Sequence, residues 1–535
     1  MSSTEFSIYW LGSRSPIITT PNITSVCIVL LLVIAFQGTS FHNQVYNAFR
    51  DWFRKWEYIW RGPSIIQEGF DKASGQPYEV QTPDTRYVFV SSPKHIEEID
   101  QAPDSILSLQ AASKHMLQPK YTMHGFSWYD LRGTEGVGFE RALRTLLTNH
   151  LPEMLPDLSR VVKVHFEQLR SEGSNQKSIP HSRVYHMMKR LVVIANAFSF
   201  FGKELCNNQE FLDAALAYIE ETVYTAEILR LLPAPLVPIV GRITAACFQS
   251  DKKVFDMLLP VVEQRCEERD MNVLGHKTPK HSDCIQWIME TSPRQNPWSA
   301  ERIIWELMAI WFGSVHSLSV TSTYAIHDIS RRPEYVQHLG DEIESQYAKF
   351  ELTGQGLPLL DSFLKESARL TPVESTSYAA FLFMLLMDQV STRRAAMKPF
   401  ELSDGTKIGV GDWTCTPVYA INQSPEHYPD PSMFNGFRFV SNELLDQMAI
   451  DTDTGSLQPT PSALAEVSSK WQFWGTGRMA CPGRFYASAV LKVIVAQVIS
   501  NYDCSLVEPD VKPWLTWRST FLPRNGFKVT FAPRQ

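Results

Sequence analysis

The chain has 535 residues, of which 44% are hydrophobic and 20% charged, and its formal net charge is −7. This composition is that of a globular protein with enough length for a large core. An acidic chain without a dense run of Lys and Arg is not typical of nucleic-acid binders, so we expect no nucleic-acid partner. After residue 60 we find no Gly/Ser-rich linker and no internal repeat, which favours one large domain.

The N-terminal region contains a segment that is apolar enough to cross a membrane. Residues 17–38 carry no charge, and their core at 23–36 is continuously apolar. One basic residue precedes this segment, whereas four follow it closely, namely Arg50, Arg54, Lys55 and Arg61. The positive-inside rule then places the bulk of the chain in the cytosol. A cleaved signal peptide is the alternative, and the long apolar core and the lack of an N-terminal basic cluster disfavour it.

We therefore predict a membrane anchor at 1–40, a linker at 41–62 and one large domain at 63–535. In that domain, β-prone runs at 78–80 and 87–90 predict a hairpin, and Ser92-Pro93 predicts the start of a helix. Most of 139–350 has a helical pattern, and the long apolar segment 301–329 predicts a central buried helix. Strand-like runs return at 397–420 and 513–531. The fold class is mainly α with a small β part.

Of the eight cysteines, Cys481 has the most informative neighbours. None of the eight forms a Cys-x-x-Cys pair, so zinc and redox motifs are unsupported. The segment 473–486 reads FWGTGRMACPGRFY, and its glycines let the backbone turn and lie against a flat ligand. Pro482 suits the first turn of a helix that 485–498 continues. A cysteine just before a helix start has a lowered pKa, and an anionic sulfur is what a thiolate-ligated iron requires.

This segment resembles the haem-binding loop of the cytochrome P450 superfamily, and its ending CPGRFYA is closest to fungal members, including those of secondary metabolism. Three further motifs match in the right order: Gly313-Ser-Val-His316-Ser317, Glu366-Ser-Ala-Arg369 and Phe434-Asn-Gly-Phe-Arg438-Phe. The resemblance covers residues 60–533. It implies the cytochrome P450 fold, here preceded by one N-terminal transmembrane helix, and haem b as the cofactor.

The resemblance also assigns roles to individual residues. Cys481 is the axial ligand of the iron, in a loop whose cofactor-binding residues include Phe473, Gly475, Gly477 and Gly483. Glu366, Arg369 and Arg438 form a buried structural triad that locks this loop. The haem propionates are expected to pair with Arg141, Arg144, Arg478 and either Arg393 or Arg394. Met479 stands where relatives often have His or Arg, so one such contact is lost or moved. For each arginine, a plain surface charge remains the alternative.

His316 and Ser317 stand where the family often has an acid followed by a threonine. We predict that His316 relays protons near neutral pH and that the Ser317 hydroxyl holds a water. The alternative for His316 is a packed side chain that donates one hydrogen bond to a carbonyl.

The implied activity is that of a monooxygenase, which inserts one oxygen atom from O₂ into a lipophilic substrate while the other leaves as water. Cysteine thiolate donates electron density that favours O–O cleavage. The expected pocket segments, 107–121, 214–243, 309–318 and 520–522, are apolar, which fits a terpenoid, indole-terpenoid or polyketide-derived intermediate of secondary metabolism. The chain has no flavin or nicotinamide domain. We therefore expect an NADPH-dependent cytochrome P450 reductase as partner, at the endoplasmic reticulum membrane, with the catalytic domain facing the cytosol.

An apolar stretch at 376–390, TSYAAFLFMLLMDQV, separates two motifs that lie almost next to each other in relatives. It is either a true insertion or retained intron sequence, and we slightly favour the intron. Two alternatives to a monooxygenase therefore stay open. One is a haem-thiolate isomerase or dehydratase, and the other is a non-catalytic product of an incompletely spliced transcript.

Overall fold

The computed structural model describes residues 40–126, 138–172, 181–372, 391–448, 450, 461–518 and 520–534. The predicted anchor segment at 17–38 and the stretch at 376–390 lie outside these residues. The chain divides into two compact units, residues 1–57 and residues 58–535. Helix α2 (Ser40–Ala73) begins in the first unit and continues into the second.

Most of the second unit is helical, as the sequence predicted. Its helices are α3 (Pro93–Gln101), α4 (Leu109–Leu117), α5 (Pro119–Thr122), α6 (Gly138–Arg141), α7 (Thr148–Glu172), α8 (Val184–Phe201), α9 (Lys203–Cys206), α10 (Gln209–Leu231), α11 (Val237–Cys247), α12 (Ser250–Val273), α13 (Cys284–Thr291), α14 (Ala300–Arg331), α15 (Val336–Thr353), α16 (Pro358–Leu370), α17 (Val418–Asn422), α18 (Asn442–Gln447) and α19 (Arg484–Asn501). Three short turns of other helix types are η1 (Ala142–Leu147), η2 (Pro333–Tyr335) and η3 (Gly477–Met479).

Within the described residues, the β part is small and consists of one five-stranded sheet and three smaller sheets. The five-stranded sheet has the order β1-β2-β8-β5-β3, and the others pair β10 with β11, β6 with β7, and β4 and β9 with β12. The strands are β1 (Tyr78–Gln81), β2 (Arg86–Phe89), β3 (Leu107–Ser108), β4 (His181–Arg183), β5 (Ser391–Ala396), β6 (Phe400–Glu401), β7 (Lys407–Ile408), β8 (Trp413–Thr416), β9 (Tyr502–Leu506), β10 (Trp514–Trp517), β11 (Thr520–Pro523) and β12 (Lys528–Pro533).

Two local predictions from the sequence are confirmed beside this sheet. β1 and β2 form the predicted antiparallel hairpin, with Tyr78 opposite Phe89. The side chain of Ser92 accepts a hydrogen bond from the backbone N–H of His95, and Pro93 is the first residue of α3. Ser92 is therefore a true N-cap, because it satisfies one of the backbone donors that the first helical turn leaves free.

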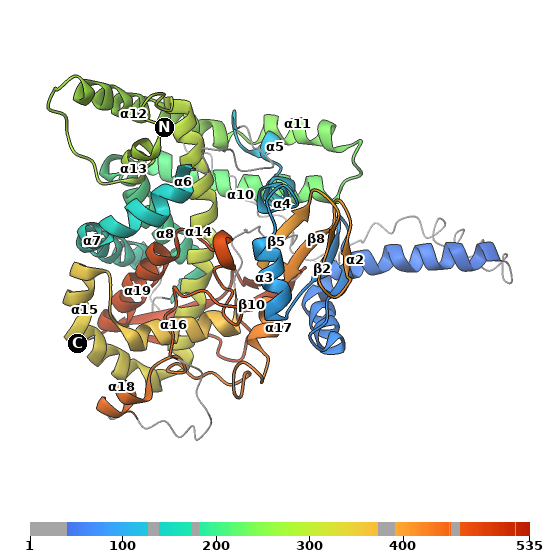
Figure 1. Ribbon diagram of the computed structural model, residues 1–535. Helices are drawn as coiled ribbons and strands as arrows, with labels where there is room; N and C mark the ends of the chain where they lie inside the picture. Colours follow the sequence, from blue (N-terminus) through green and yellow to red (C-terminus); the bar gives the residue numbers. More distant parts are fainter. Residues whose placement is uncertain are drawn as a thin grey trace, which may run out of the picture. The chain divides into compact units, whose positions relative to one another are not determined.

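Helix α14 is the predicted central buried helix. It packs against α8, α12, α16 and α19, and Figure 1 shows it crossing between the helices α7, α8 and α19 on one side and the strands β5 and β8 on the other. Within the described residues, α14 is the one helix long and apolar enough to cross a membrane. Because 72% of its most apolar window is buried inside the protein, it is a core helix of the catalytic unit.

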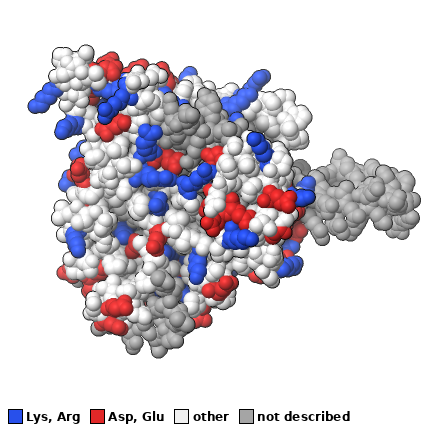
Figure 2. Space-filling view, in the orientation of Figure 1, with Lys and Arg blue, Asp and Glu red and all other residues white. Residues whose placement is uncertain are grey.

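On the face drawn in Figure 2, charged side chains of both signs lie on the described part of the surface. On the face in Figure 2, Lys and Arg are interspersed with Asp and Glu in the part that the structure describes. The same mixing is found in the ion pairs of the surface, such as Arg61 with Glu68 at 3.0 Å and Arg160 with Asp157 at 2.7 Å. Such exposed pairs contribute little to stability.

Candidate active site

The residues predicted as a structural triad meet in the interior of the protein. Arg369 binds Glu366 through two parallel hydrogen bonds, from Nε at 2.7 Å and from NH2 at 2.8 Å. The Nε atom of Arg438 reaches the same carboxylate at 3.2 Å. The side chains of Glu366 and Arg369 are 0% exposed and that of Arg438 is 5% exposed. Three charges at such depth are tolerated because they pair with one another and with backbone groups.

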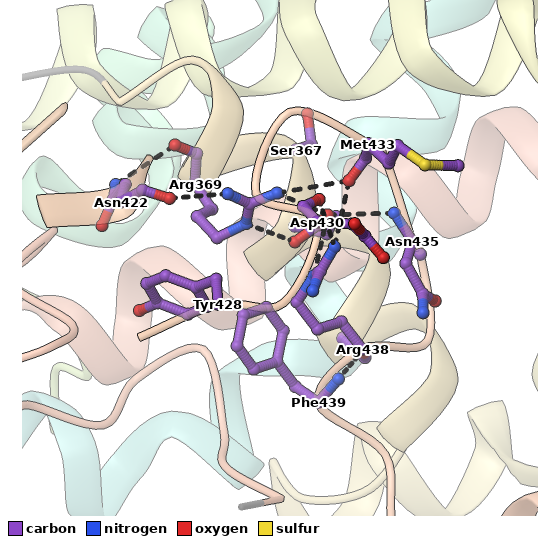
Figure 3. Close-up of polar contacts among 12 residues, drawn as sticks. Ser367, Arg369, Asn422, Tyr428, Asp430, Met433, Asn435, Arg438 and Phe439 are labelled. Atoms are coloured by element: carbon purple, nitrogen blue, oxygen red, sulfur yellow. Dashed lines mark hydrogen bonds and ion pairs between the residues drawn. The ribbon is translucent and has the colours of Figure 1, made fainter. Parts of the chain in front are cut away.

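The triad also holds the segment that supplies Arg438. Figure 3 shows the backbone groups of Met433 and Asn435 turned toward the two guanidinium groups and the carboxylate. The N–H of Asn435 donates to Glu366 at 2.9 Å, while the carbonyl of Met433 accepts from Arg438 at 3.0 Å. Arg369 also donates to the carbonyl of Asn422 at 2.7 Å. The triad thus connects α16 to α17 and to the segment around residue 435.

Cys481 lies at the end of a loop that runs directly into α19. We call residues 473–483 the cysteine loop. The N–H of Cys481 donates to the carbonyl of Trp474 at 2.7 Å, and this bond closes the loop. Helix α19 begins at Arg484, so the prediction that Pro482 lies in its first turn is wrong by two residues. The apolar run that follows is helical as predicted, and Cys481 lies three residues before the helix start.

The electrostatics of the Cys481 thiol differ from the simple prediction. Burial raises its pKa, and the N–H of Gly483 and the positive charges of Arg484 and Arg144 act in the opposite direction. We predicted a lowered pKa from the helix start alone, and that prediction is wrong because the cost of desolvating the charged sulfur is larger. Coordination to a metal deprotonates a thiol outright, so the N–H of Gly483 and the positive charges of Arg484 and Arg144 would stabilise a sulfur bound to iron.

The glycines of the cysteine loop differ in their backbone conformation and in the atoms that surround them. Gly475 has φ +80° and Gly477 has φ +54°, which side chains other than that of glycine rarely adopt. A Cβ atom on Gly477 would lie 2.7 Å from Cγ of Asp100. The predicted role of Gly477 was to let the backbone approach a flat ligand, whereas its close neighbour in the structure is a carboxylate on α3. At Gly483 an added Cβ would make only an ordinary van der Waals contact, at 3.9 Å from Leu143.

The middle of α14 opens at the residues that the sequence singled out. Gly313 is exposed, and Ser314 and Ser317 are half-buried, although the helix around them is buried. A Cβ on Gly313 would meet nothing within 4 Å, so open space adjoins the helix there. The Ser317 hydroxyl has no hydrogen-bond partner among the residues that the structure describes. A hydroxyl of this kind is ready to bind a water or a ligand.

His316 is in a different environment from Ser317. It is 3% exposed, and burial together with the charge of Lys189 lowers its pKa to about 3. The prediction that it relays protons as a group titrating near neutral pH does not agree with this value. The ring is therefore neutral at physiological pH, because a charged imidazolium would lack solvation there.

A hydrogen-bonded group connects this part of α14 to α19. The hydroxyl of Tyr486 donates to Oδ1 of Asn196 on α8 at 2.9 Å, and Nδ2 of Asn196 donates to Ser314 at 3.1 Å. Asn196 on α8 therefore links α19 to α14 at Ser314, the residue next to Gly313.

Arg141 and Arg144, two of the predicted propionate ligands, both contact protein groups. Arg141 ends α6 and donates to the carbonyl of Thr291 at 3.3 Å. Arg144 lies in η1, pairs with Glu140 at 2.8 Å and donates to the carbonyl of Arg478 at 3.2 Å. Arg144 is therefore beside the cysteine loop.

The other three arginines predicted as propionate ligands also contact protein groups. Arg393 on β5 is buried and contacts Sδ of Met116 at 3.5 Å. Arg394 is turned to α3, where it binds Asp100 at 2.6 Å and the carbonyl of Ile99 at 2.9 Å. Arg478 donates to Asp104 at 2.9 Å and to the carbonyl of Ala102 at 2.6 Å.

The structure adds residues to the site that the sequence reasoning did not select. Trp474 accepts the Cys481 N–H and donates its own indole N–H to the carbonyl of Leu464 at 2.6 Å. Its neighbour Phe473, which was predicted to bind the cofactor, stacks on Trp471 with 5.5 Å between the ring centroids. Arg484 donates to the carbonyl of Cys481 at 3.0 Å. Its position directly after Gly483 in the quoted motif was the available signal, whereas no sequence signal indicated Asp100.

These residues suit a haem. The partly buried Cys481 lies in a loop with glycines on both sides of it, open space adjoins α14 at Gly313, and the Ser317 hydroxyl has no hydrogen-bond partner in the described structure. Cys481 would bind the iron, and Arg144 is placed beside the loop that carries it.

Comparison with known proteins agrees with this fold. The family model described as cytochrome P450 matches residues 60–531. The chain is 28% identical over 479 residues to cytochrome P450 monooxygenase 151 of Postia placenta (strain ATCC 44394 / Madison 698-R), covering 88% of this chain and 89% of that protein. It is 27% identical to cytochrome P450 monooxygenase janP of Penicillium janthinellum, covering 83% of this chain and 80% of that protein.

Among solved structures, retinoic acid-bound cyanobacterial CYP120A1 matches with a TM-score of 0.59 and 16% identity, covering 89% of this chain and 97% of that one. The fold and the family match together define a haem protein whose iron is bound by a cysteine thiolate. The chain belongs to the cytochrome P450 family and is a monooxygenase, an oxidoreductase of that family. The resemblance to fungal members that its motifs suggested is confirmed.

Proposed function

We propose that this enzyme inserts one oxygen atom from O₂ into a lipophilic intermediate of a secondary-metabolite pathway, with Cys481 as the ligand of the haem iron. The observation that carries the proposal is the position of Cys481, partly buried at the end of a closed loop that Arg144 contacts. When bound, the haem supplies the oxygen-cleaving chemistry, and the protein orients and shields it.

Residues of this chain have distinct roles in the proposal. Glu366, Arg369 and Arg438 hold the segments behind the cysteine loop. Ser317 binds a water beside Gly313 and passes a proton toward the open side of α14. His316, being neutral, assists as a hydrogen-bonding ring without carrying charge. Arg141, Arg144, Arg393 and Arg478 are the candidates for the propionates, and of these Arg144 is supported by its contact with the loop.

The substrate class follows from the apolar character of the expected pocket and from the relatives. A terpenoid, indole-terpenoid or polyketide-derived compound is proposed. A panel of such compounds added to the purified enzyme should include some that shift the spin state of the haem and so change its absorption. A panel in which no lipophilic compound produces a shift would contradict this class.

We further propose a single-pass anchor in the endoplasmic reticulum membrane, with the catalytic domain in the cytosol. Residues 17–38 support this by their lack of charge. A second contact is proposed at α11, where Leu236, Ile239 and Ile243 are 46%, 59% and 57% exposed. Most of the apolar residues of α10 are buried, so the exposed apolar side chains of the region 214–243 lie at α11. Leu31→Arg with Val33→Arg should release the full chain from microsomes in alkaline carbonate.

An NADPH-dependent cytochrome P450 reductase is the proposed electron donor. Basic side chains on the surface beside the cysteine loop are the proposed contact. Electron transfer from the reductase should then slow as the salt concentration rises. A rate that does not depend on salt would argue against this contact.

The decisive experiment is the absorption spectrum of the reduced full chain with carbon monoxide. We expect the red-shifted Soret band of a thiolate-ligated haem. Cys481→Ser should abolish it, and Cys247→Ser, a change at an exposed cysteine, should keep it. A folded wild-type chain without this band, or a band that persists in Cys481→Ser, would overturn the proposal.

A further inference from the structure

We propose that Asp100, on the last turn of α3, is a positioning residue for the cysteine loop. It lies more than three hundred and seventy residues before that loop in sequence, yet its Oδ1 atom accepts a hydrogen bond from the Thr476 hydroxyl at 2.8 Å. This inference rests on the proposed role of Cys481 as the iron ligand, because it concerns how that cysteine is presented.

Asp100 is itself fixed by an arginine. Arg394, 1% exposed, binds the same Oδ1 atom at 2.6 Å and also donates to the neighbouring carbonyl of Ile99 at 2.9 Å. A charge-assisted pair with one partner this deeply buried holds its geometry well. Arg394 therefore ties β5 to the end of α3, and Asp100 transmits that fixed position to the loop.

The loop backbone is also packed against the carboxylate. A Cβ on Gly477 would lie 2.7 Å from Cγ and Oδ2 of Asp100. Only a backbone without a side chain can approach so closely, and the φ of +54° at Gly477 likewise favours glycine. Thr476 and Gly477 thus both contact one carboxylate, through a hydrogen bond and through close packing.

Two further contacts hold the cysteine loop beside Asp100. Thr392 on β5 lies with its hydroxyl 3.2 Å from that of Thr476, and Arg478 donates to the carbonyl of Ala102 just after α3. The loop from Thr476 to Arg478 is therefore held from the side of α3 and β5, whereas the triad of Glu366, Arg369 and Arg438 acts from α16.

These contacts bear on the position of Cys481, the proposed iron ligand. Thr476 precedes Cys481 by five residues, and the bond from the Cys481 N–H to Trp474 closes the loop around it. A shift of Thr476 would therefore move the sulfur. Groups that orient a metal ligand in this way are typically needed for about 10-fold to 100-fold of metal-site affinity.

The test uses the full-length holoenzyme with Asp100→Ala and Thr476→Val. Both should keep the fold, measured by circular dichroism, while part of the reduced, carbon monoxide-bound protein moves from the red-shifted band to the band of haem without a thiolate ligand. Haem dissociation should also become about 10-fold faster. Thr476→Ser, which keeps the hydroxyl, should restore the wild-type spectrum.

Asp412→Asn is the matched control. Asp412 pairs with Arg86 at 2.5 Å in the same sheet region and is 18% exposed, close to the 16% of Asp100, but it does not contact the loop. This control should keep the red-shifted band. If Asp100→Ala keeps the wild-type spectrum and haem dissociation, or if Asp412→Asn changes them equally, the inference is wrong. A wild-type protein without the red-shifted band would instead reject the proposed function.

Discussion

Glu366 and Arg438 meet at 3.2 Å across seventy-two residues of sequence, and the same carboxylate oxygen also accepts from Arg369 at 2.8 Å. The Arg438 guanidinium in turn donates to the carbonyl of Pro429 at 2.6 Å. Removing this one side chain would leave a buried carboxylate with one cation instead of two, and backbone oxygens without their donor.

Arg438→Met should therefore lower the free energy of unfolding by about 3–5 kcal/mol. It should also reduce the haem content of the purified protein. Arg438→Lys keeps the charge but not the planar fork, so its loss should be intermediate. Chemical denaturation of the holoenzyme measures the free energy of unfolding of the wild type, Arg438→Met and Arg438→Lys. A loss in Arg438→Met of less than about 1 kcal/mol, the range of exposed ion pairs, would show that the buried geometry is not needed.

Ser317→Ala should uncouple the reaction. If Ser317 holds the water that delivers a proton, peroxide released per NADPH should rise, and product formation should fall about 10-fold or more. The matched control is Ser319→Ala on the same helix. Its hydroxyl is fully buried and donates to the carbonyl of Val315 at 2.7 Å, so it is turned into the helix. Equal coupling in the wild type and in Ser317→Ala would remove Ser317 from the proton path.

His316 should make stability depend on pH. Its folded-state pKa of about 3 lies below the ordinary value of 6.5, so between these limits the unfolded chain binds a proton that the folded chain does not. Stability should therefore fall as the pH falls from about 6.5 toward 3, by up to about 1.4 kcal/mol per pH unit. Denaturation of wild type and His316→Gln at pH 8 and pH 5 tests this. The difference between the two proteins at pH 8 reflects packing, and a difference that stays unchanged at pH 5 would contradict the prediction.

The sequence predicted those parts of the site that depend on local patterns. The helix start after Cys481, the cap at Ser92 and the central helix α14 follow from periodicity and from residue types at fixed spacing. The contact of Arg438 with Glu366 was implied by resemblance alone, since no spacing rule joins α16 to residue 438.

Other parts of the site depend on distant packing and were not predictable. The contacts of Asp100 with Arg394 and Thr476 require α3, β5 and the cysteine loop to meet, and nothing in the local sequence around Asp100 indicates them. The low pKa of His316 comes first from its burial among distant segments and second from the charge of Lys189 on α8. Burial, which no single window of sequence reveals, also changed the direction of the pKa shift of Cys481.

A second buried ion cluster joins three segments near the expected pocket. Arg230 at the end of α10 binds Asp84 in the β1–β2 turn at 2.7 Å, and Arg518 after β10 binds Glu227 at 2.9 Å and Asp84 at 3.3 Å. All four side chains are at most 5% exposed. Burial acts to raise the pKa of Asp84, but the charges of Arg230 and Arg518 outweigh it and hold that pKa well below its usual range.

Arg230→Met should thus destabilise the holoenzyme by about 3–5 kcal/mol, because Asp84 remains buried with one weaker partner. Asp84→Asn combined with Arg230→Met should cost less than the sum of the two single changes, since each removes the partner of the other. Arg61→Met, at a pair with side chains 47% and 52% exposed, should cost under about 1 kcal/mol. Strictly additive single and double changes would mean that Asp84 and Arg230 do not stabilise each other, and the cluster would then be a set of independent contacts.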